Sequence, residues 1–237
     1  IDKMYVILPF EKTFYEDKHH FPVSFVGHPL IDAIQAHPVI DDATFRKENQ
    51  LNDLPIIALL PGSRKQEITK MLSVMLSVAD DFKRYQFVIA GAPSQEYSFY
   101  QQFITSDNIK FLSNKTYDLL QHATAALVTS GTATLETALF KVPEVVCYKG
   151  NWISYQIAKR IITLKYISLV NLIMDKEVVT ELIQDDCNTK RIASELQKIL
   201  EPEHRKIVLE NYRILEEKLG GKGASSTTAK LIVADLK

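Results

Sequence analysis

An arginine in this 237-residue sequence follows a glycine turn, at the expected start of a helix. Gly62, Ser63 and Arg64 come after the apolar run Ile56–Leu60, which has the composition of a strand buried on both faces. Apolar residues then recur every three or four positions and predict a helix over Glu67–Tyr85. Free backbone N–H groups and the helix dipole would point at one place there, and an arginine fork suits phosphate. The stretch therefore predicts a phosphate-binding loop, although an ordinary strand–helix unit with a surface arginine has the same local pattern.

A second stretch repeats this arrangement further along the chain. The strand expected over Ala125–Thr129 runs into Ser130, Gly131 and Thr132, and a helix follows. We expect Ser130 or Thr132 to cap that helix and Gly131 to expose N–H groups. Glu136, one turn into the helix, is placed to accept two hydrogen bonds from a ribose diol. A capping motif with an acidic residue in the first turn is the alternative interpretation. Two such loops on one sheet favour a diphosphate-linked ligand.

Bringing the two loops together requires a particular kind of sheet. From position 55 onward, short apolar runs alternate with helical segments, which predicts the α/β class: a Rossmann-like parallel sheet with helices on both faces. Ligands of such sheets bind beyond the carboxyl ends of the strands. The strands are expected at Ile56–Leu60, Gln86–Ala90, Ile109–Leu112, Ala125–Thr129 and Glu144–Tyr148. The helices between them are expected at Glu67–Tyr85, Gln95–Thr105, Thr116–Gln121 and Thr132–Phe140.

The regions on either side of this alternation have shorter or purely helical patterns. Before it, we expect strands at Met4–Leu8 and Phe21–Val26, and helices at Phe10–Asp17, Ile31–Ala36 and Ala43–Asn49. After it, we expect only helices, at Trp152–Leu164, Lys176–Ile183, Thr189–Leu200, Glu203–Leu219 and Ser225–Leu236. Because the chain starts with Ile1, at the edge of a strand, we expect it to be a fragment of something longer.

Composition and missing motifs exclude several classes of function. The net charge of -1 gives no bulk attraction to nucleic acid. The sequence lacks the phosphate-loop pattern G-x-x-x-x-G-K-[ST], the dinucleotide pattern G-x-G-x-x-G and the hydrolase pattern G-x-S-x-G. The six histidines show no metal-ligand spacing, and Cys147 and Cys187 are isolated. We therefore expect no metal and no cofactor, and a reducing compartment.

The segment Tyr148–Ile173 mixes aromatic with basic residues, among them Trp152, Lys159, Arg160 and Lys165. A basic amphipathic stretch can lie on a membrane surface, but a core-packed helix with solvated lysines is the favoured interpretation. No apolar run reaches the roughly 18 residues of a membrane-spanning helix.

Asn171 stands in an apolar run near the end of that segment. It either caps the next turn or points into a site.

Five motifs together resemble the lipid-A-disaccharide synthase family, which is glycosyltransferase family 19. They follow the order of that family at similar spacing, over nearly the whole chain. They are Pro9-Phe10-Glu11, Phe25-Val26-Gly27-His28-Pro29-Leu30, Leu59-Leu60-Pro61-Gly62-Ser63-Arg64, Ser130-Gly131-Thr132-Ala133-Thr134-Leu135-Glu136 and Ser168-Leu169-Val170-Asn171-Leu172-Ile173. Val170 departs from the family pattern, in which a proline often precedes the asparagine.

The resemblance implies a two-domain GT-B glycosyltransferase, of which this chain is the C-terminal half. Residues 1–35 would be the tail end of the N-terminal acceptor domain and a linker. Residues 36–200 would form the UDP-sugar-binding domain, and residues 201–237 would be helices that pack back toward the N-terminal domain. Gly62, Ser63 and the loop 130–132 would bind the donor, and Arg64 would stabilise the leaving diphosphate. Glu136 matches a ribose-binding acid, and Asn171 a donor-site residue.

The implied reaction transfers 2,3-diacylglucosamine from its UDP derivative to 2,3-diacylglucosamine 1-phosphate, with inversion and release of UDP. The general base would lie in the other half of the protein. The implied location is the cytoplasm, peripherally on the inner membrane, and a homodimer is compatible with the resemblance. Two alternatives from other classes remain, a UDP-sugar 2-epimerase of the same fold and a non-catalytic UDP-binding module. We expect the 237-residue chain alone to bind UDP without turnover.

Overall fold

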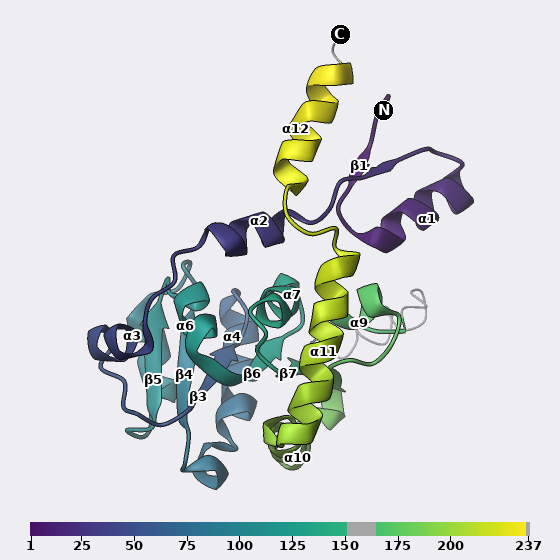
Figure 1. The fold of residues 1–237 in the computed structure, drawn as a ribbon. Helices are drawn as coiled ribbons and strands as arrows, with labels where there is room; N and C mark the ends of the chain where they lie inside the picture. Colours follow the sequence, from purple (N-terminus) through teal and green to yellow (C-terminus); the bar gives the residue numbers. More distant parts are fainter. Residues whose placement is uncertain (151–164, 236–237) are drawn as a thin grey trace.

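The chain folds around a parallel sheet in a computed structural model that describes residues 1–150 and 165–235. In this part of the chain the large sheet has six strands in the order β5-β4-β3-β6-β7-β8, and every neighbouring pair is parallel (Figure 1). The strands are β3 (Ile56–Leu60), β4 (Gln86–Gly91), β5 (Ile109–Ser113), β6 (Ala123–Thr129), β7 (Glu144–Tyr148) and β8 (Thr180–Ile183). The predicted Rossmann-like α/β class is confirmed.

The central strand β3 is buried on both faces, as its unbroken apolar run predicts. Ile57 and Leu59 belong to one hydrophobic core, whereas Ile56, Ala58 and Leu60 belong to another. Successive side chains of a strand point to opposite faces, so this division places one core on each side of the sheet.

Helices cover both faces and supply the rest of each core (Figure 1). One core includes residues of α4 (Lys65–Leu76) and α10 (Thr189–Leu200), and the opposite core includes residues of α3 (Asp42–Glu48) and α6 (Thr116–His122). A third cluster joins α7 (Thr132–Leu139), α9 (Leu169–Met174) and α11 (Pro202–Lys218) over β7. The amphipathic spacing in the sequence therefore corresponds to real core-facing stripes.

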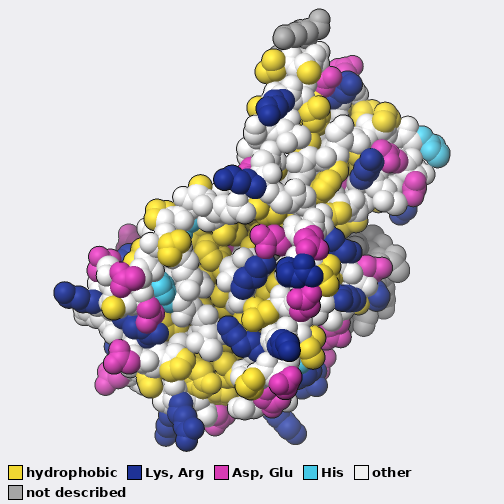
Figure 2. Space-filling view, viewed as in Figure 1, with side chains coloured by type: hydrophobic (Ala, Val, Ile, Leu, Met, Phe, Trp, Pro, Cys, Tyr) yellow, Lys and Arg dark blue, Asp and Glu magenta, His cyan; other side chains and the backbone are white. Residues whose placement is uncertain are grey.

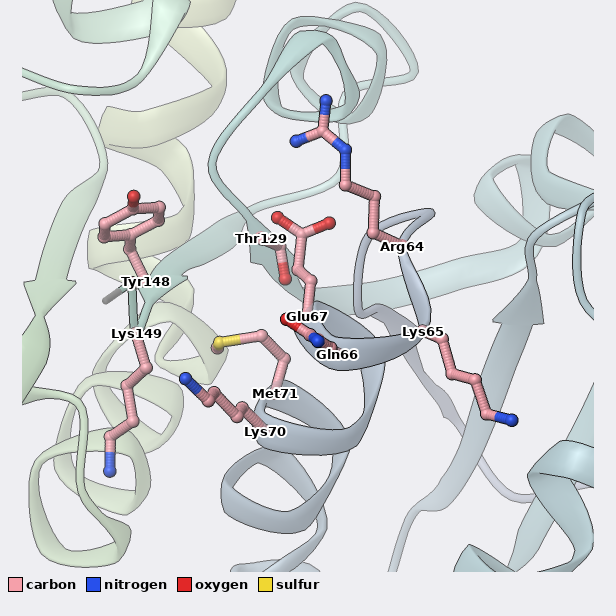
Figure 3. A pocket seen from close by; sticks show the side chains of 10 residues that line it. Arg64, Lys65, Gln66, Glu67, Lys70, Met71, Thr129, Tyr148 and Lys149 are labelled. Carbon is pink, nitrogen blue, oxygen red and sulfur yellow. The ribbon is translucent and has the colours of Figure 1, made fainter. Parts of the chain in front are cut away.

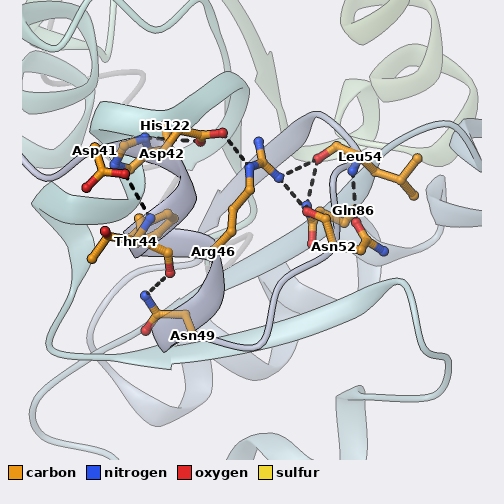
Figure 4. A network of polar contacts seen from close by, with 10 residues as sticks. Asp41, Asp42, Thr44, Arg46, Asn49, Asn52, Leu54, Gln86 and His122 are labelled. Carbon is orange, nitrogen blue, oxygen red and sulfur yellow. Dashed lines mark hydrogen bonds and ion pairs between the residues drawn. The ribbon is translucent and has the colours of Figure 1, made fainter.

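A polar network fixes the amino end of the sheet, opposite the predicted ligand-binding edge (Figure 4). The Arg46 guanidinium donates to the Asp42 carboxylate over 2.7 Å and to the carbonyls of Asn52 and Leu54 over 2.6 and 3.0 Å. The Gln86 amide donates to the same two carbonyls over 2.9 and 2.6 Å. These contacts tie α3 and the start of β4 to the segment that leads into β3.

The order of the strands creates a topological switch between β3 and β6. From β3 the chain adds β4 and β5 on one side, and it then returns to place β6 on the other side of β3. Leu60, at the end of β3, pairs with Val128 near the end of β6. The loops that follow these two strands therefore leave the sheet next to each other, at the place where open α/β sheets bind ligands.

Three expected helices differ from those in the structure. The helix predicted at Lys176–Ile183 is wrong, because its second half is the edge strand β8, where Leu182 pairs with Cys147. The β-branched residues before and within this strand favour pairing on the sheet over a helix. The helices predicted at Glu67–Tyr85 and Gln95–Thr105 are shorter in the structure. They break into α4 with the 3-10 helix Ala79–Phe82, and into α5 (Tyr97–Tyr100) with the 3-10 helix Gln101–Phe103.

One further difference concerns the region after β7, where another expectation is not tested. The short helix α9 was not expected, and its N-cap is Ser168, whose side chain accepts from the Asn171 N–H. The expected helix Trp152–Leu164 lies outside the described residues.

The first and last described segments of the chain lie together, away from the large sheet (Figure 1 and Figure 2). The first residues form β1 (Tyr5–Val6), α1 (Pro9–His19), β2 (Ser24–Phe25) and α2 (Pro29–Ala36), and β1 and β2 pair in parallel. The last helix, α12 (Ala224–Asp235), begins where the Asp32 carboxylate accepts from the N–H groups of Gly223 and Ser225, over 2.6 and 3.0 Å. Lys3 lies 3.5 Å from Asp235 at its other end.

Candidate functional site

A pocket of about 390 Å³ lies at the carboxyl ends of β3, β6 and β7 (Figure 3). These are the strand ends that bracket the topological switch, so the cavity lies where the sequence predicts ligand binding. Its lining consists mainly of charged and polar side chains from the start of α4 and the ends of β6 and β7. The lining residues are Arg64, Lys65, Gln66, Glu67, Lys70, Met71, Thr129, Tyr148, Lys149 and Gly150.

The first predicted loop turns sharply at Gly62, which has φ +97° and therefore a conformation that favours glycine. Arg64 is the N-cap of α4, with no side-chain cap of its own, and its exposed side chain lines the pocket. The Ser63 N–H donates to Glu67 Oε2 over 3.2 Å, and the Ser63 carbonyl accepts from Ser94 Oγ over 3.1 Å. The sequence did not single out Glu67, because a glutamate in the first turn of a helix is common.

The second predicted loop leaves the start of α7 open. Gly131 is the N-cap, and no side chain caps this helix. The prediction that Ser130 or Thr132 caps it is therefore wrong: Ser130 Oγ donates instead to the Ile167 carbonyl over 2.9 Å, and Thr132 is the first helical residue. A Cβ built on Gly131 would meet no described atom within 4 Å. Among the described residues, no side chain accepts from the N–H groups at the start of α7, as an anion-binding helix start requires.

Glu136 lies near the middle of α7 and holds a hydrogen bond that the sequence did not reveal. Tyr117, at the start of α6, donates its phenol to Glu136 Oε1 over 2.8 Å. Burial, and then the contact with Glu136, raises the pKa of Tyr117, so the phenol remains a donor at neutral pH. Its ring also packs against His37 and Phe140, with centroid distances of 5.4 and 5.1 Å. Glu136 is thus oriented by Tyr117 and keeps acceptor capacity for a ligand.

Asn171 does not line the pocket. Its side chain neither caps the next turn nor points into the site, which were the two expectations from the sequence. It is fully buried, and its Oδ1 accepts from the N–H groups of Val178 and Val179 over 2.7 and 3.0 Å. Its amide donates to the Val179 carbonyl and to Glu181 Oε1, each over 2.8 Å. These four bonds use the whole capacity of the side chain. In this arrangement Asn171 holds the segment before β8 in place and does not offer an atom to a donor ligand.

The Asn171 network nevertheless reaches the second loop. Glu181 accepts from the N–H groups of Ile167 and Ser168, each over 2.9 Å, and the Ile167 carbonyl is the acceptor for Ser130 Oγ. Asn171 and Glu181 therefore position the backbone against which Ser130 rests.

The charge of the pocket lining is strongly positive. Among its described residues, four are cationic, namely Arg64, Lys65, Lys70 and Lys149, and Glu67 is the one acid. Figure 3 shows Lys65 pointing away from the other side chains, in agreement with its ammonium group lying 5.3 Å from the Phe99 ring. In the described ranges, no group of three or more His, Cys, Asp or Glu is arranged to hold a metal ion, and no helix is long and apolar enough to cross a bilayer.

Solved structures with the same fold define the class. The UDP-GlcNAc 2-epimerase of Neisseria meningitidis, bound to UDP-GlcNAc, aligns with a TM-score of 0.67 at 14% identity, over 98% of this chain and 62% of that one. The S. aureus MnaA–UDP co-structure aligns with a TM-score of 0.64 at 16% identity, over 99% and 61%. At such identities the likeness concerns the fold, which is that of one half of a GT-B enzyme.

The sequence gives the family within that class. The model of the lipid-A-disaccharide synthetase family matches residues 1–233, and the chain belongs to this family. Relatives include the lipid-A-disaccharide synthases of Syntrophus aciditrophicus, 40% identical over 100% of this chain, and of Geobacter sulfurreducens, 35% identical over 98%. The chain spans 63% and 62% of the length of these two relatives.

Proposed function

We propose that this chain is the sugar-nucleotide-binding part of a lipid-A-disaccharide synthase. The complete enzyme would transfer 2,3-diacylglucosamine from UDP-2,3-diacylglucosamine to the 6-hydroxyl of 2,3-diacylglucosamine 1-phosphate, with inversion and release of UDP. Membership of the family supports this reaction. The observation that supports the binding role is that β3 and β6, the strands that lead into the two glycine loops, are neighbours in the sheet, with the pocket at their carboxyl ends.

The chemistry of the loops suits the leaving diphosphate. Negative charge grows on the diphosphate as the sugar departs, so donors that are already aimed at it lower the barrier. Arg64 lines the pocket and would bring a guanidinium to one side of the diphosphate. The start of α7, at Gly131 and Thr132, would bring backbone N–H groups to the other side. Glu136, held by Tyr117, would accept from the ribose hydroxyls.

We also propose the division of the chain that the family implies, with residues 1–35 ending the acceptor domain, 36–200 binding the donor, and 201–237 returning to the first part through α12, after α11 has packed over β7. The contacts of Asp32 with Gly223 and Ser225, and of Lys3 with Asp235, support it, because they join the first and last segments directly.

The decisive experiment assays the complete protein with a radiolabelled acyl-sugar acceptor and UDP-2,3-diacylglucosamine. The proposal predicts a disaccharide product and release of UDP, and the isolated 237-residue chain should bind UDP without forming product. A parallel assay with UDP-GlcNAc tests 2-epimerisation. Epimerised sugar nucleotide without disaccharide would reject the proposal in favour of an epimerase, and UDP binding by the complete protein with neither product would indicate a non-catalytic module.

Because both proposed substrates carry acyl chains, we propose that the complete protein works peripherally on a membrane surface. Lys165 is exposed and belongs to the basic aromatic segment, whereas Trp152, Lys159 and Arg160 lie outside the described residues. Sedimentation with anionic vesicles should show binding at low salt and partial release at high salt. Equal recovery in the supernatant with and without vesicles would contradict this part of the proposal.

A further inference from the structure

The carboxylate of Glu67 lies against the backbone of the first glycine loop. Its Oε2 accepts from the Ser63 N–H over 3.2 Å. The same oxygen lies 2.1 Å from the point where a Cβ on Gly62 would stand, so the carboxylate fills the space that the glycine leaves free. Figure 3 shows this side chain rising from the first turn of α4 into the middle of the lining residues.

The chemical setting of Glu67 is that of a bound anion. It is the one acid among the described residues that line the pocket, where four side chains are cationic. A carboxylate oxygen and a phosphate oxygen are equivalent acceptors for a backbone N–H at the start of a helix. They cannot accept from the Ser63 N–H in the same place at the same time, so a phosphate that approaches this loop must displace the carboxylate.

We propose that Glu67 occupies the position that one phosphate group of the sugar nucleotide takes at Gly62 and Ser63, and that it swings aside when the nucleotide binds. This inference rests on the proposed function, since it requires a diphosphate at the first loop. The side chain is half-buried and starts at the pocket rim, so a rotamer change can carry it toward solvent.

In this role Glu67 lowers the affinity of the site for the diphosphate and does not change its affinity for the nucleoside. A role confined to holding the loop makes the opposite prediction. In that case the contact with Ser63 would keep the loop in its binding shape, as the glutamate of a capping box does, and its loss would weaken binding.

Calorimetric titration of the 237-residue chain with UDP and with uridine separates the two roles. The variants are Glu67→Gln, which keeps the size and one acceptor oxygen, and Glu67→Ala. The matched control is Glu96→Gln, which removes one carboxylate from the exposed start of α5, outside the lining. Both Glu67 variants should bind UDP about two- to fivefold more tightly, as removal of a partly exposed like charge permits, with uridine affinity unchanged. The control should match the parent for both ligands.

Thermal unfolding of each protein shows whether the fold is kept, and Glu67→Gln keeps the test valid if Glu67→Ala loosens the loop. Unchanged or weaker UDP binding by folded Glu67→Gln would overturn the inference while leaving UDP binding itself intact. Absence of UDP binding by the parent and by Glu67→Gln alike would instead reject the proposed function of this site, and the inference with it.

Discussion

Arg64 and Glu136 would act on different parts of the proposed donor, so their variants should have different kinetic effects. Arg64 lies at the pocket beside the first loop, where charge would grow during the proposed reaction. Glu136 lies on α7, with Tyr117 on one carboxylate oxygen, where it would meet the ribose, whose charge does not change. Groups that gain interaction only in the transition state affect turnover, whereas uniformly binding groups affect affinity.

Arg64→Ala in the complete protein should lower kcat more than it raises the KM for the donor. The expected loss is about 2–4 kcal/mol of transition-state stabilisation, as for other lost charge-stabilising donors. Steady-state kinetics measures the separate effects on kcat and KM. Arg64→Lys keeps the charge without the planar fork, so it should recover only part of the lost kcat. If kcat stays at the parent value in a folded Arg64→Ala protein, this arginine is only a surface residue.

Glu136→Gln should weaken UDP binding, and Glu136→Ala should weaken it further. A carboxylate can accept from both ribose hydroxyls, whereas an amide retains one acceptor oxygen, so the loss for alanine should reach about 1.5–3 kcal/mol. Tyr117→Phe should weaken UDP binding less, by about 0.5–1.5 kcal/mol, because it removes only the hydrogen bond that orients Glu136. Calorimetry with UDP checks the order, and three variants with parental affinity would return Glu136 to the capping interpretation.

At the scale of elements, the local sequence pattern was enough to predict the type and bounds of a segment that is buried on both faces or that has one apolar stripe. The bounds of β3, β7 and α10 are those expected. The edge strand β8 was missed because its state depends on pairing with β7, which lies far away in the sequence. The roles of Tyr117 and Asn171 were not predictable for a similar reason, since each depends on a side-chain contact between elements that only the fold brings together. Glu67 contacts Ser63, only four residues away, but a glutamate in the first turn of a helix is too common to single out.

Asn171→Ala should destabilise the region around α9 and β8. It leaves the N–H groups of Val178 and Val179 without their buried acceptor, and unsatisfied groups of this kind cost about 1–3 kcal/mol each. Chemical denaturation should show this loss in the free energy of unfolding. Asn188→Ala, which removes a side-chain cap at the exposed start of α10, is a control expected to cost about 1 kcal/mol. A smaller loss for Asn171→Ala than for the control would contradict the role assigned to its four hydrogen bonds.

At the scale of the whole molecule, the order of the strands both places the two glycine loops at neighbouring strands and determines which side chains are buried. The sequence predicted which loops follow strands, but only the assembled sheet shows that β3 and β6 are neighbours. The same assembly buries Glu144 completely at the start of β7, and neither carboxyl oxygen has a hydrogen-bond partner in the described part of the chain. Burial raises the pKa of Glu144 well above its ordinary value of 4.5.

Glu144 should therefore make the free energy of unfolding fall as the pH rises above about 4.5. The unfolded chain ionises this carboxyl near its ordinary pKa, while the folded chain keeps it protonated until the raised pKa is reached. Glu144→Gln cannot ionise, so it should be more stable than the parent at pH 8, by about 1–3 kcal/mol, and similar to it at pH 4. Denaturation curves at both pH values test this, and an equal difference at the two would rule out titration of Glu144.

The claim that the two glycine loops together bind a nucleoside diphosphate is tested most directly by amide ¹H–¹⁵N spectra of the 237-residue chain during titration with UDP. The account predicts that the amide resonances of Gly62, Ser63, Gly131 and Thr132 shift most, with one common dissociation constant. Shifts confined elsewhere, for example to Lys110 and Phe111 at the second cavity beside β5, or no shifts at millimolar UDP, would contradict it.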